Sequence, residues 1–181
     1  MAIGEARTLS RDVEVTAIPY GDRMTLKSGS SVYVTQSLGG TYTLMTDMGY
    51  MVRLDNGDAD AIGEEAVPTP GPEELKDRPV QELCWDQLKT CYDPEIPVNI
   101  VDLGLVYACD ATALDNGGHK VDVRFTLTAP GCGMGDILRV DIERKLISLP
   151  GVKEIDVQIA FDPPWDQSMM TEAARLQLGL M

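Results

Sequence analysis

A proline-rich segment divides the chain into two parts with different sequence patterns. The segment from Glu64 to Pro79 contains four of the 11 prolines and shows no apolar periodicity, which is typical of a linker between folded units. A chain of 181 residues is long enough for one domain or for two small ones. We therefore expect a β-rich unit over residues 1–63, a linker over 64–79 and a second domain over 80–181.

The first part has the pattern of short β-strands. Between residues 13 and 62, apolar and polar side chains alternate in short runs that glycines separate, and a period of two predicts strands. Asn56-Gly57 is a pair favoured in tight turns. The aspartates around it lack the flanking helices and the closing glutamate of an EF-hand calcium loop, so we interpret them as turn residues. The pattern predicts a small antiparallel β unit.

The second part alternates between two periodicities. Apolar residues at helical spacing predict helices over 80–91 and 136–149, and Thr171 or Ser168 is suited to cap a short final helix. Alternating apolar residues predict strands over 101–111, 121–127 and 151–161. The order is α-β-β-α-β-α, and a strand–helix–strand crossover of this kind places its helix on one face of the sheet. The expected fold class is α+β.

Charge and hydropathy exclude several classes of partner. The formal net charge is −14 and the sequence pI is about 4.3, and such a field repels the phosphates of nucleic acids. No apolar run approaches the roughly 18 residues of a membrane span, and the first residues lack the apolar stretch of a signal peptide. We expect a cytoplasmic protein that binds neither nucleic acid nor membranes.

Three of the four cysteines have the positions of core residues. Cys84 and Cys91 fall on the apolar face of the first predicted helix of the second part, and Cys109 ends a predicted strand. No two cysteines form a CxxC pair, and their spacing matches no zinc ribbon or finger. The single histidine, His119, falls in a polar hairpin turn, where we expect it to be solvated.

The fourth cysteine, Cys132, lies in a glycine-rich loop between a predicted strand and a predicted helix. Exposed backbone N–H groups and the positive end of the helix dipole favour the thiolate, which binds metals and attacks electrophiles. The same pattern also fits a small apolar residue in a tight loop. A phosphate-binding role is disfavoured, because the loop lacks the Lys-Ser/Thr ending of a Walker motif.

Asp93 and Glu95 form an acidic pair just after the helix predicted over 80–91, with Asp102 further along the chain. Helix termination and loop solvation account for such residues in most proteins. The functional alternative is that their carboxylates lie near Cys132, because hard oxygen ligands suit iron as well as thiolate does. The sequence pattern leaves both readings open.

Four stretches of the second part resemble a known family, the metal–sulfur cluster assembly domain. This domain occurs in SufT, in PaaD of the phenylacetate pathway and at the start of some ApbC/Mrp-type ATPases. The stretches cover Asp93–Pro97 with Val101–Tyr107, Leu127–Cys132, Gly151-Val152 with Phe161–Trp165, and Met170–Arg175. The first part, with its stretches 35–43 and 58–61, looks like an extension of the SufT branch.

This resemblance implies a non-enzymatic accessory factor that assists the assembly of Fe–S clusters or their transfer to client apoproteins. Its partners would be Suf proteins and those clients. Cys132 stands at the position of the family's reactive cysteine, and Asp93 and Glu95 stand in its acidic loop. The implied metal ligands are therefore Cys132, Asp93 and Glu95, for labile iron or a labile cluster. Gly133 replaces the proline that follows the cysteine in many relatives, and the chain has neither an ATPase domain nor a cysteine-rich tail.

An Fe–S cluster normally takes four protein ligands, and one chain offers a single well-placed cysteine. We therefore expect a homodimer in which paired Cys132 residues bridge the iron or cluster. Two alternatives remain. One is an adaptor that docks clients onto the Suf machinery without binding metal. The other is a thiol enzyme with Cys132 as nucleophile, which is disfavoured because no base or CxxC partner is recognisable.

Overall fold

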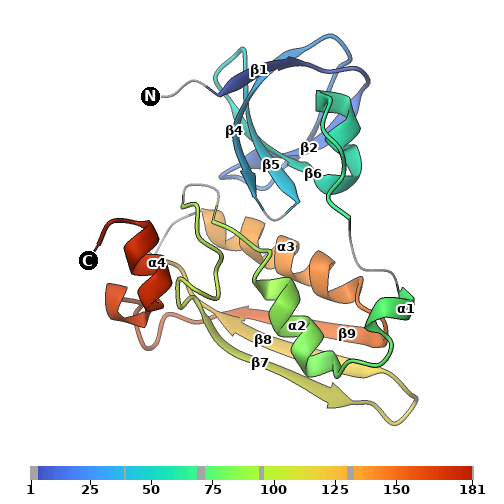
Figure 1. Ribbon diagram of the computed structural model, residues 1–181, viewed down its shortest axis with the longest axis vertical. Helices are drawn as coiled ribbons and strands as arrows, with labels where there is room; N and C mark the ends of the chain where they lie inside the picture. The colour runs from blue at the N-terminus through green and yellow to red at the C-terminus, as the bar shows by residue number, and fades with distance from the viewer. Residues whose placement is uncertain (1–3, 39, 69–71, 94–95, 130–132, 181) are drawn as a thin grey trace. The chain divides into compact units, whose positions relative to one another are not determined.

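Two separate sheets form, one in each part of the chain (Figure 1). The computed structural model describes residues 4–38, 40–68, 72–93, 96–129 and 133–180. The chain divides into two compact units, unit 1 over residues 1–69 and unit 2 over residues 70–181. Each unit has an apolar core of its own.

Unit 1 is a curved antiparallel sheet of six strands in the order β1-β4-β5-β6-β2-β3 (Figure 1). This confirms the predicted antiparallel β unit. Its elements are β1 (Glu5–Thr8), β2 (Val13–Ile18), β3 (Arg23–Leu26), β4 (Ser31–Leu38), β5 (Thr41–Thr46), β6 (Met51–Asp55) and the 3₁₀-helix η1 (Asn56–Ile62).

The segment predicted as a tight turn at Asn56-Gly57 is the start of η1. The helix forms because Ala59, Ala61 and Ile62 pack into the core of unit 1, and this burial outweighs the local turn preference of Asn-Gly. Two of the surrounding aspartates pair with one cation, because Arg11 binds Asp58 at 2.8 Å and Asp60 at 2.6 Å.

Several residues of the predicted linker bind to unit 1. The side chain of Asn56 accepts a hydrogen bond from Val67 N at 2.7 Å and donates one to Val67 O at 3.0 Å. Glu64 pairs with Arg7 at 2.9 Å. Residues 64–67 therefore continue the packing of unit 1 rather than leaving it at Gly63.

Unit 2 has three strands in the order β7-β8-β9, with β7 and β8 antiparallel and β8 and β9 parallel. The order α-β-β-α-β-α and the α+β class are confirmed, and a short helix, α1, precedes them. The elements are α1 (Pro72–Leu75), α2 (Val80–Leu88), β7 (Val106–Ala113), β8 (His119–Phe125), α3 (Met134–Ile147), β9 (Val152–Ile159), the 3₁₀-helix η2 (Gln167–Met169) and α4 (Glu172–Gln177).

Helices α2 and α3 lie against the same face of this sheet (Figure 1). The strands turn Val121, Val123 and Phe125 into the core, and α3 covers them with Leu138 and Ile142. The final helix starts at the predicted cap, since the Thr171 hydroxyl accepts a hydrogen bond from Ala174 N at 3.2 Å.

The first strand of unit 2 starts later than its alternation predicts. Leu103 and Leu105 are fully buried, yet they lie in a turn that precedes β7. The turn closes at Gly104, whose φ is 76°. A Cβ at this position would lie 2.2 Å from Met169 O, so only glycine allows the C-terminal segment to approach so closely.

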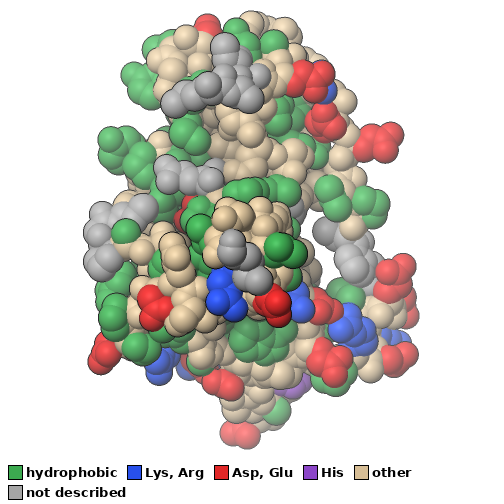
Figure 2. All heavy atoms as spheres, turned by 60° about the vertical axis from the view of Figure 1, so that its left-hand side comes forward, with side chains coloured by type: hydrophobic (Ala, Val, Ile, Leu, Met, Phe, Trp, Pro, Cys, Tyr) green, Lys and Arg blue, Asp and Glu red, His purple; other side chains and the backbone are tan. Residues whose placement is uncertain are grey.

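No helix among the described residues is long and apolar enough to cross a membrane. Asp and Glu side chains appear on both units in the space-filling view rather than on one element (Figure 2). On the face shown, acidic side chains therefore occur on both units.

Candidate functional site

Three segments that carry the sequence motifs meet at one end of the sheet of unit 2. We call residues 96–107, 126–129 and 160–175 the motif segments. Thr126 N donates to Leu105 O at 2.7 Å, and Thr171 N donates to Asp102 O at 2.9 Å. Ala160 N donates to the last residue of β8, Phe125, at 2.8 Å. Gly151-Val152, the other part of the third stretch, lies at the start of β9, at the opposite end of the sheet.

Side chains of the motif segments strengthen this contact. The indole Nε1 of Trp165 donates to Leu103 O at 2.8 Å, and the Tyr107 hydroxyl donates to Pro163 O at 2.6 Å. Both bonds join residues more than 50 positions apart in the sequence. The aromatic side chains Trp165 and Tyr107 thus bind backbone carbonyls and join the motif segments.

Of the three predicted metal ligands, the structure describes only Asp93. This residue is 7% exposed, and its carbonyl accepts a hydrogen bond from Ile96 N at 3.3 Å. Glu95 and Cys132 lie outside the described residues. The predicted ligand set of Cys132, Asp93 and Glu95 therefore stays a prediction.

The part of the Cys132 loop that is described leads directly into α3. Gly133 is the N-terminal flanking residue of this helix, and no side chain caps it. Helix α3 has 14 residues, and its first N–H groups point toward the preceding loop. This arrangement agrees with the sequence argument that the loop lies at the positive end of a helix dipole.

Asp102 organises its own loop. Its Oδ2 accepts a hydrogen bond from Asn99 Nδ2 at 2.7 Å, and its backbone N–H donates to Asn99 Oδ1 at 2.9 Å. Its carbonyl oxygen receives Thr171 N. These bonds make Asp102 a positioning residue that ties the loop to the C-terminal segment.

Sequence reasoning missed a buried charge on α3. Asp141 is 1% exposed, and its carboxylate lies 3.5 Å from Arg144 Nη2 and 3.6 Å from Lys145 Nζ. Lys145 also donates to Thr90 O at 2.5 Å, which links α3 to the segment that leads to Asp93. The signal was present in the sequence, because Asp141 occupies a position on the apolar stripe of α3 between Leu138 and Ile142.

A second missed residue is Thr126, which directly follows β8. It is 1% exposed, and among the described residues its hydroxyl has no hydrogen-bond partner. A buried hydroxyl without a partner is costly, and this one lies at the start of the motif segment 126–129.

The three described cysteines lie in the core, as the sequence predicts. Cys84, Cys91 and Cys109 are buried free thiols. Cys91 donates to Gln87 O at 3.7 Å. Within the described ranges, no group of three or more His, Cys, Asp or Glu side chains could hold a metal ion.

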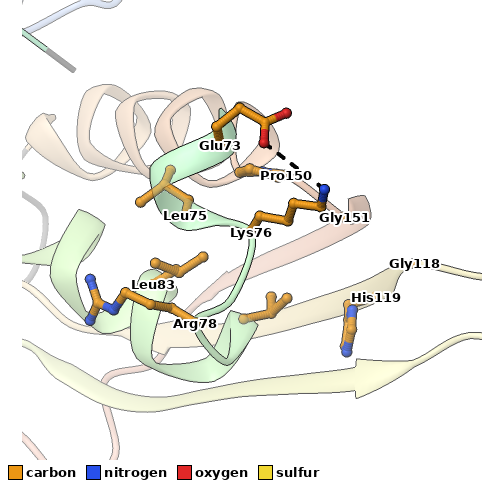
Figure 3. A pocket seen from close by; sticks show the side chains of 10 residues that line it. Glu73, Leu75, Lys76, Arg78, Leu83, Gly118, His119, Pro150 and Gly151 are labelled. Carbon is orange, nitrogen blue, oxygen red and sulfur yellow. Dashed lines mark ion pairs between the residues drawn. The ribbon is translucent and has the colours of Figure 1, made fainter. Parts of the chain in front are cut away.

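A pocket of about 450 Å³ lies at the other end of β8 (Figure 3). It is lined by α1, the start of α2 and the turns before β8 and β9. His119 lines it and is half-buried, with Nδ1 unpartnered among the described residues, whereas the sequence suggested a solvated turn. At the rim of the pocket, Lys76 Nζ forms an ion pair with Glu73 Oε2 at 3.9 Å, which Figure 3 marks with a dashed line. The length of β8, about 20 Å, separates this pocket from the motif segments.

Comparisons with known proteins concern mainly unit 2. A family model described as "Iron-sulfur cluster assembly protein" matches residues 84–157. A "Fe-S protein maturation auxiliary factor" of Porphyromonas gingivalis is 45% identical over 94 residues, which are 52% of this chain and 86% of that protein.

Two further relatives have similar names. The Bacillus subtilis "Fe-S protein maturation auxiliary factor YitW" is 36% identical over 56% of this chain and 95% of its own length. The Staphylococcus aureus "Fe-S protein maturation auxiliary factor SufT" is 38% identical over 49% of this chain and 96% of its own length. Because these relatives are matched almost completely by about half of this chain, the other half has no counterpart in them. The expected SufT-type origin of the first part gains no support from them.

Proposed function

Since the chain belongs to the family of iron–sulfur cluster assembly proteins, we propose that it is an accessory factor in the maturation of Fe–S proteins. The observation that carries this proposal is the convergence of the three motif segments at one end of the unit 2 sheet. A loop that is fixed in this way can present ligands from a rigid support.

The finer proposal is that the protein assists the assembly of clusters or their transfer to client apoproteins. The iron or cluster is then cargo rather than a resident cofactor. Cys132 would supply the thiolate, and Asp93 and Glu95 would supply carboxylate oxygens. The dipole of α3 favours the thiolate form of a cysteine at its N-terminus, and Lys145 and Asp102 hold the segments around Asp93 in place. A site with few protein ligands binds weakly, which suits a carrier that must release its cargo.

One chain offers too few thiolates for a stably held cluster. We propose that two copies share the cargo through paired Cys132 residues. Native mass spectrometry tests this point: iron should be retained on dimers only, and iron retained on a monomer would refute the shared site.

The partners that follow from this role are Fe–S assembly proteins and their client apoproteins. The relatives are named auxiliary factors, and we propose a role without a catalytic step for this chain as well. A cytoplasmic location remains part of the proposal.

The test is anaerobic reconstitution with iron and sulfide, followed by visible absorption and iron counting. The wild type is compared with Cys132→Ala and with Cys91→Ala, a control cysteine that is buried in the core. We expect the chromophore to be lost in Cys132→Ala and kept in Cys91→Ala. If none of the three proteins holds iron while all still bind assembly proteins, the adaptor alternative replaces the carrier proposal.

A further inference from the structure

Two buried thiols of unit 2 face each other where α2 packs on β7. Cys84 lies on α2 and is 0% exposed, and Cys109 lies on β7 and is 4% exposed. Both belong to the same apolar cluster and both are free thiols. Helix α2 packs directly on β7, and the two thiols are close enough for each to perturb the pKa of the other.

The side chain of Gln81 fixes the position of α2 on β7. Its Nε2 donates to Cys109 O at 2.5 Å, and its Oε1 accepts from Ala111 N at 2.8 Å. Because β7 is an edge strand, its outer backbone groups are available for this bridge. Cys84 follows Gln81 by three positions and so projects from the same side of the helix. The two hydrogen bonds of Gln81 to the β7 backbone, one helical turn before Cys84, therefore set how the two thiols lie toward each other.

The two thiols differ in acidity. The hydrogen bond from Cys109 lowers the pKa of Cys84, while donating that bond and being buried raise the pKa of Cys109. Cys84 is thus the thiol of the pair whose pKa is lowered, and the thiolate is the form that reacts with oxidants.

We propose that Cys84 and Cys109 are a reversible oxidation site, at which a hydroperoxide produces a disulfide that joins α2 to β7. In the first step, the Cys84 thiolate attacks the peroxide O–O bond. This gives a sulfenic acid and, with hydrogen peroxide, one water after protonation of the leaving hydroxide. In the second step, the Cys109 sulfur displaces the hydroxyl of the sulfenic acid, which leaves as a second water with the Cys109 proton. Each sulfur loses one electron, and the peroxide gains both.

The disulfide would close the segment 85–108. This segment contains Asp93 and the first motif segment, so the cross-link restricts the loop in which two of the predicted metal ligands lie. A cross-link of this kind stabilises mainly by limiting the unfolded chain. Burial explains why only a small oxidant is expected to reach the pair, during local opening of the core.

The experiment treats the reduced full-length protein with hydrogen peroxide, blocks the remaining thiols by alkylation and maps the peptides without reduction. We expect a mass loss of two hydrogen atoms, a single cross-linked peptide pair that contains Cys84 and Cys109, and full reversal by dithiothreitol. The thermal midpoint of the oxidised protein should be higher than that of the reduced protein.

Matched variants locate the cross-link. Cys91→Ala removes an equally buried thiol whose partner is the Gln87 carbonyl, and it should still form the disulfide. Cys84→Ala and Cys109→Ala should not. The peptide map of the wild type does not depend on whether these variants fold. The proposal would be overturned if Cys84 and Cys109 remained fully alkylatable after peroxide treatment. It would also be overturned if the cross-link involved Cys132 instead. Iron loading is not part of this readout, so the result is independent of the proposed function.

Discussion

The long-range polar contacts of the two units differ in kind and in place. In unit 1, ion pairs at the surface join distant segments, as Arg11 between β1 and β2 does with Asp58 and Asp60 in η1. In unit 2, single hydrogen bonds join segments that are far apart in the sequence, as Trp165 does with Leu103 and Tyr107 with Pro163. The long-range polar contacts of unit 1 thus include charged pairs at its surface, whereas those of unit 2 join the motif segments through backbone carbonyls.

The comparisons fall on one side of this difference. The family model matches residues 84–157, which belong entirely to unit 2. Unit 1 instead exposes large side chains on two neighbouring turns: Tyr20 is 79% exposed and Met48 75%, and the turns are adjacent because Ile18 pairs with Met51. We conclude that unit 2 carries the family's architecture and that unit 1 is an added module.

The largest expected effect comes from Gly104→Ala in unit 2. The new Cβ would lie 2.2 Å from Met169 O at a φ of 76°, so the C-terminal segment must move away from the loop. We expect the free energy of unfolding of unit 2 to fall by about 4 kcal/mol, as measured by urea denaturation.

The matched control in unit 1 is Gly29→Ala. Gly29 also has a positive φ, 85°, but its Cβ would meet no atom within 4 Å. The expected cost is only about 1 kcal/mol, from the backbone conformation alone. Equal costs at the two glycines would contradict the view that the turn in unit 2 is shaped by a close approach.

The second prediction concerns independence of the two cores. Leu44 in unit 1 and Leu138 in unit 2 are both 0% exposed and belong to different clusters. Each change to alanine should cost about 3 kcal/mol and should accelerate hydrogen exchange in its own unit only. Leu44→Ala should also leave iron loading unchanged. Faster exchange in both units after either change would show that the chain unfolds as one cooperative body.

Much of the fold could be predicted because burial imposes a period on the sequence. The alternation around Val121–Phe125 and the apolar stripe of α3 identify these elements without other information. β1 escaped prediction because its residues are mostly exposed, so its pairing with β4, rather than burial, makes it a strand. The start of β7 was placed too early because Leu103 and Leu105 alternate as a strand would, while Gly104 turns the chain.

The site could be predicted only as a set of motifs. The sequence places Asp93, Glu95 and Cys132 in loops, and loop geometry depends on distant partners that no local pattern reveals. The bond from Trp165 to the Leu103 carbonyl is an example, since its acceptor is a backbone group that every residue has. Asp141 was overlooked because a charged residue on an apolar stripe is most simply read as an interruption of it.

The third prediction tests the long-range hydrogen bonds. Tyr107→Phe removes the hydroxyl that donates to Pro163 O at 2.6 Å. We expect unit 2 to lose about 1 kcal/mol of stability, as measured by urea denaturation. Tyr20→Phe is the matched change in unit 1, where the hydroxyl belongs to a side chain that is 79% exposed, and it should have no measurable effect. If Tyr20→Phe lowered the stability as much as Tyr107→Phe, the long-range hydrogen bond of Tyr107 would not be what stabilises unit 2.

The smallest expected effect is the response of the two units to acid. In unit 1, hydrogen bonds from Arg11 lower the pKa of Asp60, and the backbone N–H of Ser28, followed by Lys27, lowers that of Asp12. In unit 2, Ser168 lowers the pKa of Asp166. A carboxyl group whose pKa is lower in the folded state stabilises the fold above its unfolded value of 3.8, and this contribution is lost as the pH falls through the folded value.

Unit 1 has two such carboxyl groups among the described residues and unit 2 has one, so acid should affect unit 1 more. We expect the thermal midpoint of unit 1 to fall more steeply between about pH 5 and about pH 2. Asp60→Asn should flatten this dependence, because the amide cannot be protonated in that range, while leaving the response of unit 2 unchanged. Since all three groups are exposed to solvent, added salt should also weaken the effect. An unchanged acid slope in Asp60→Asn would show that the pairing with Arg11 does not stabilise η1.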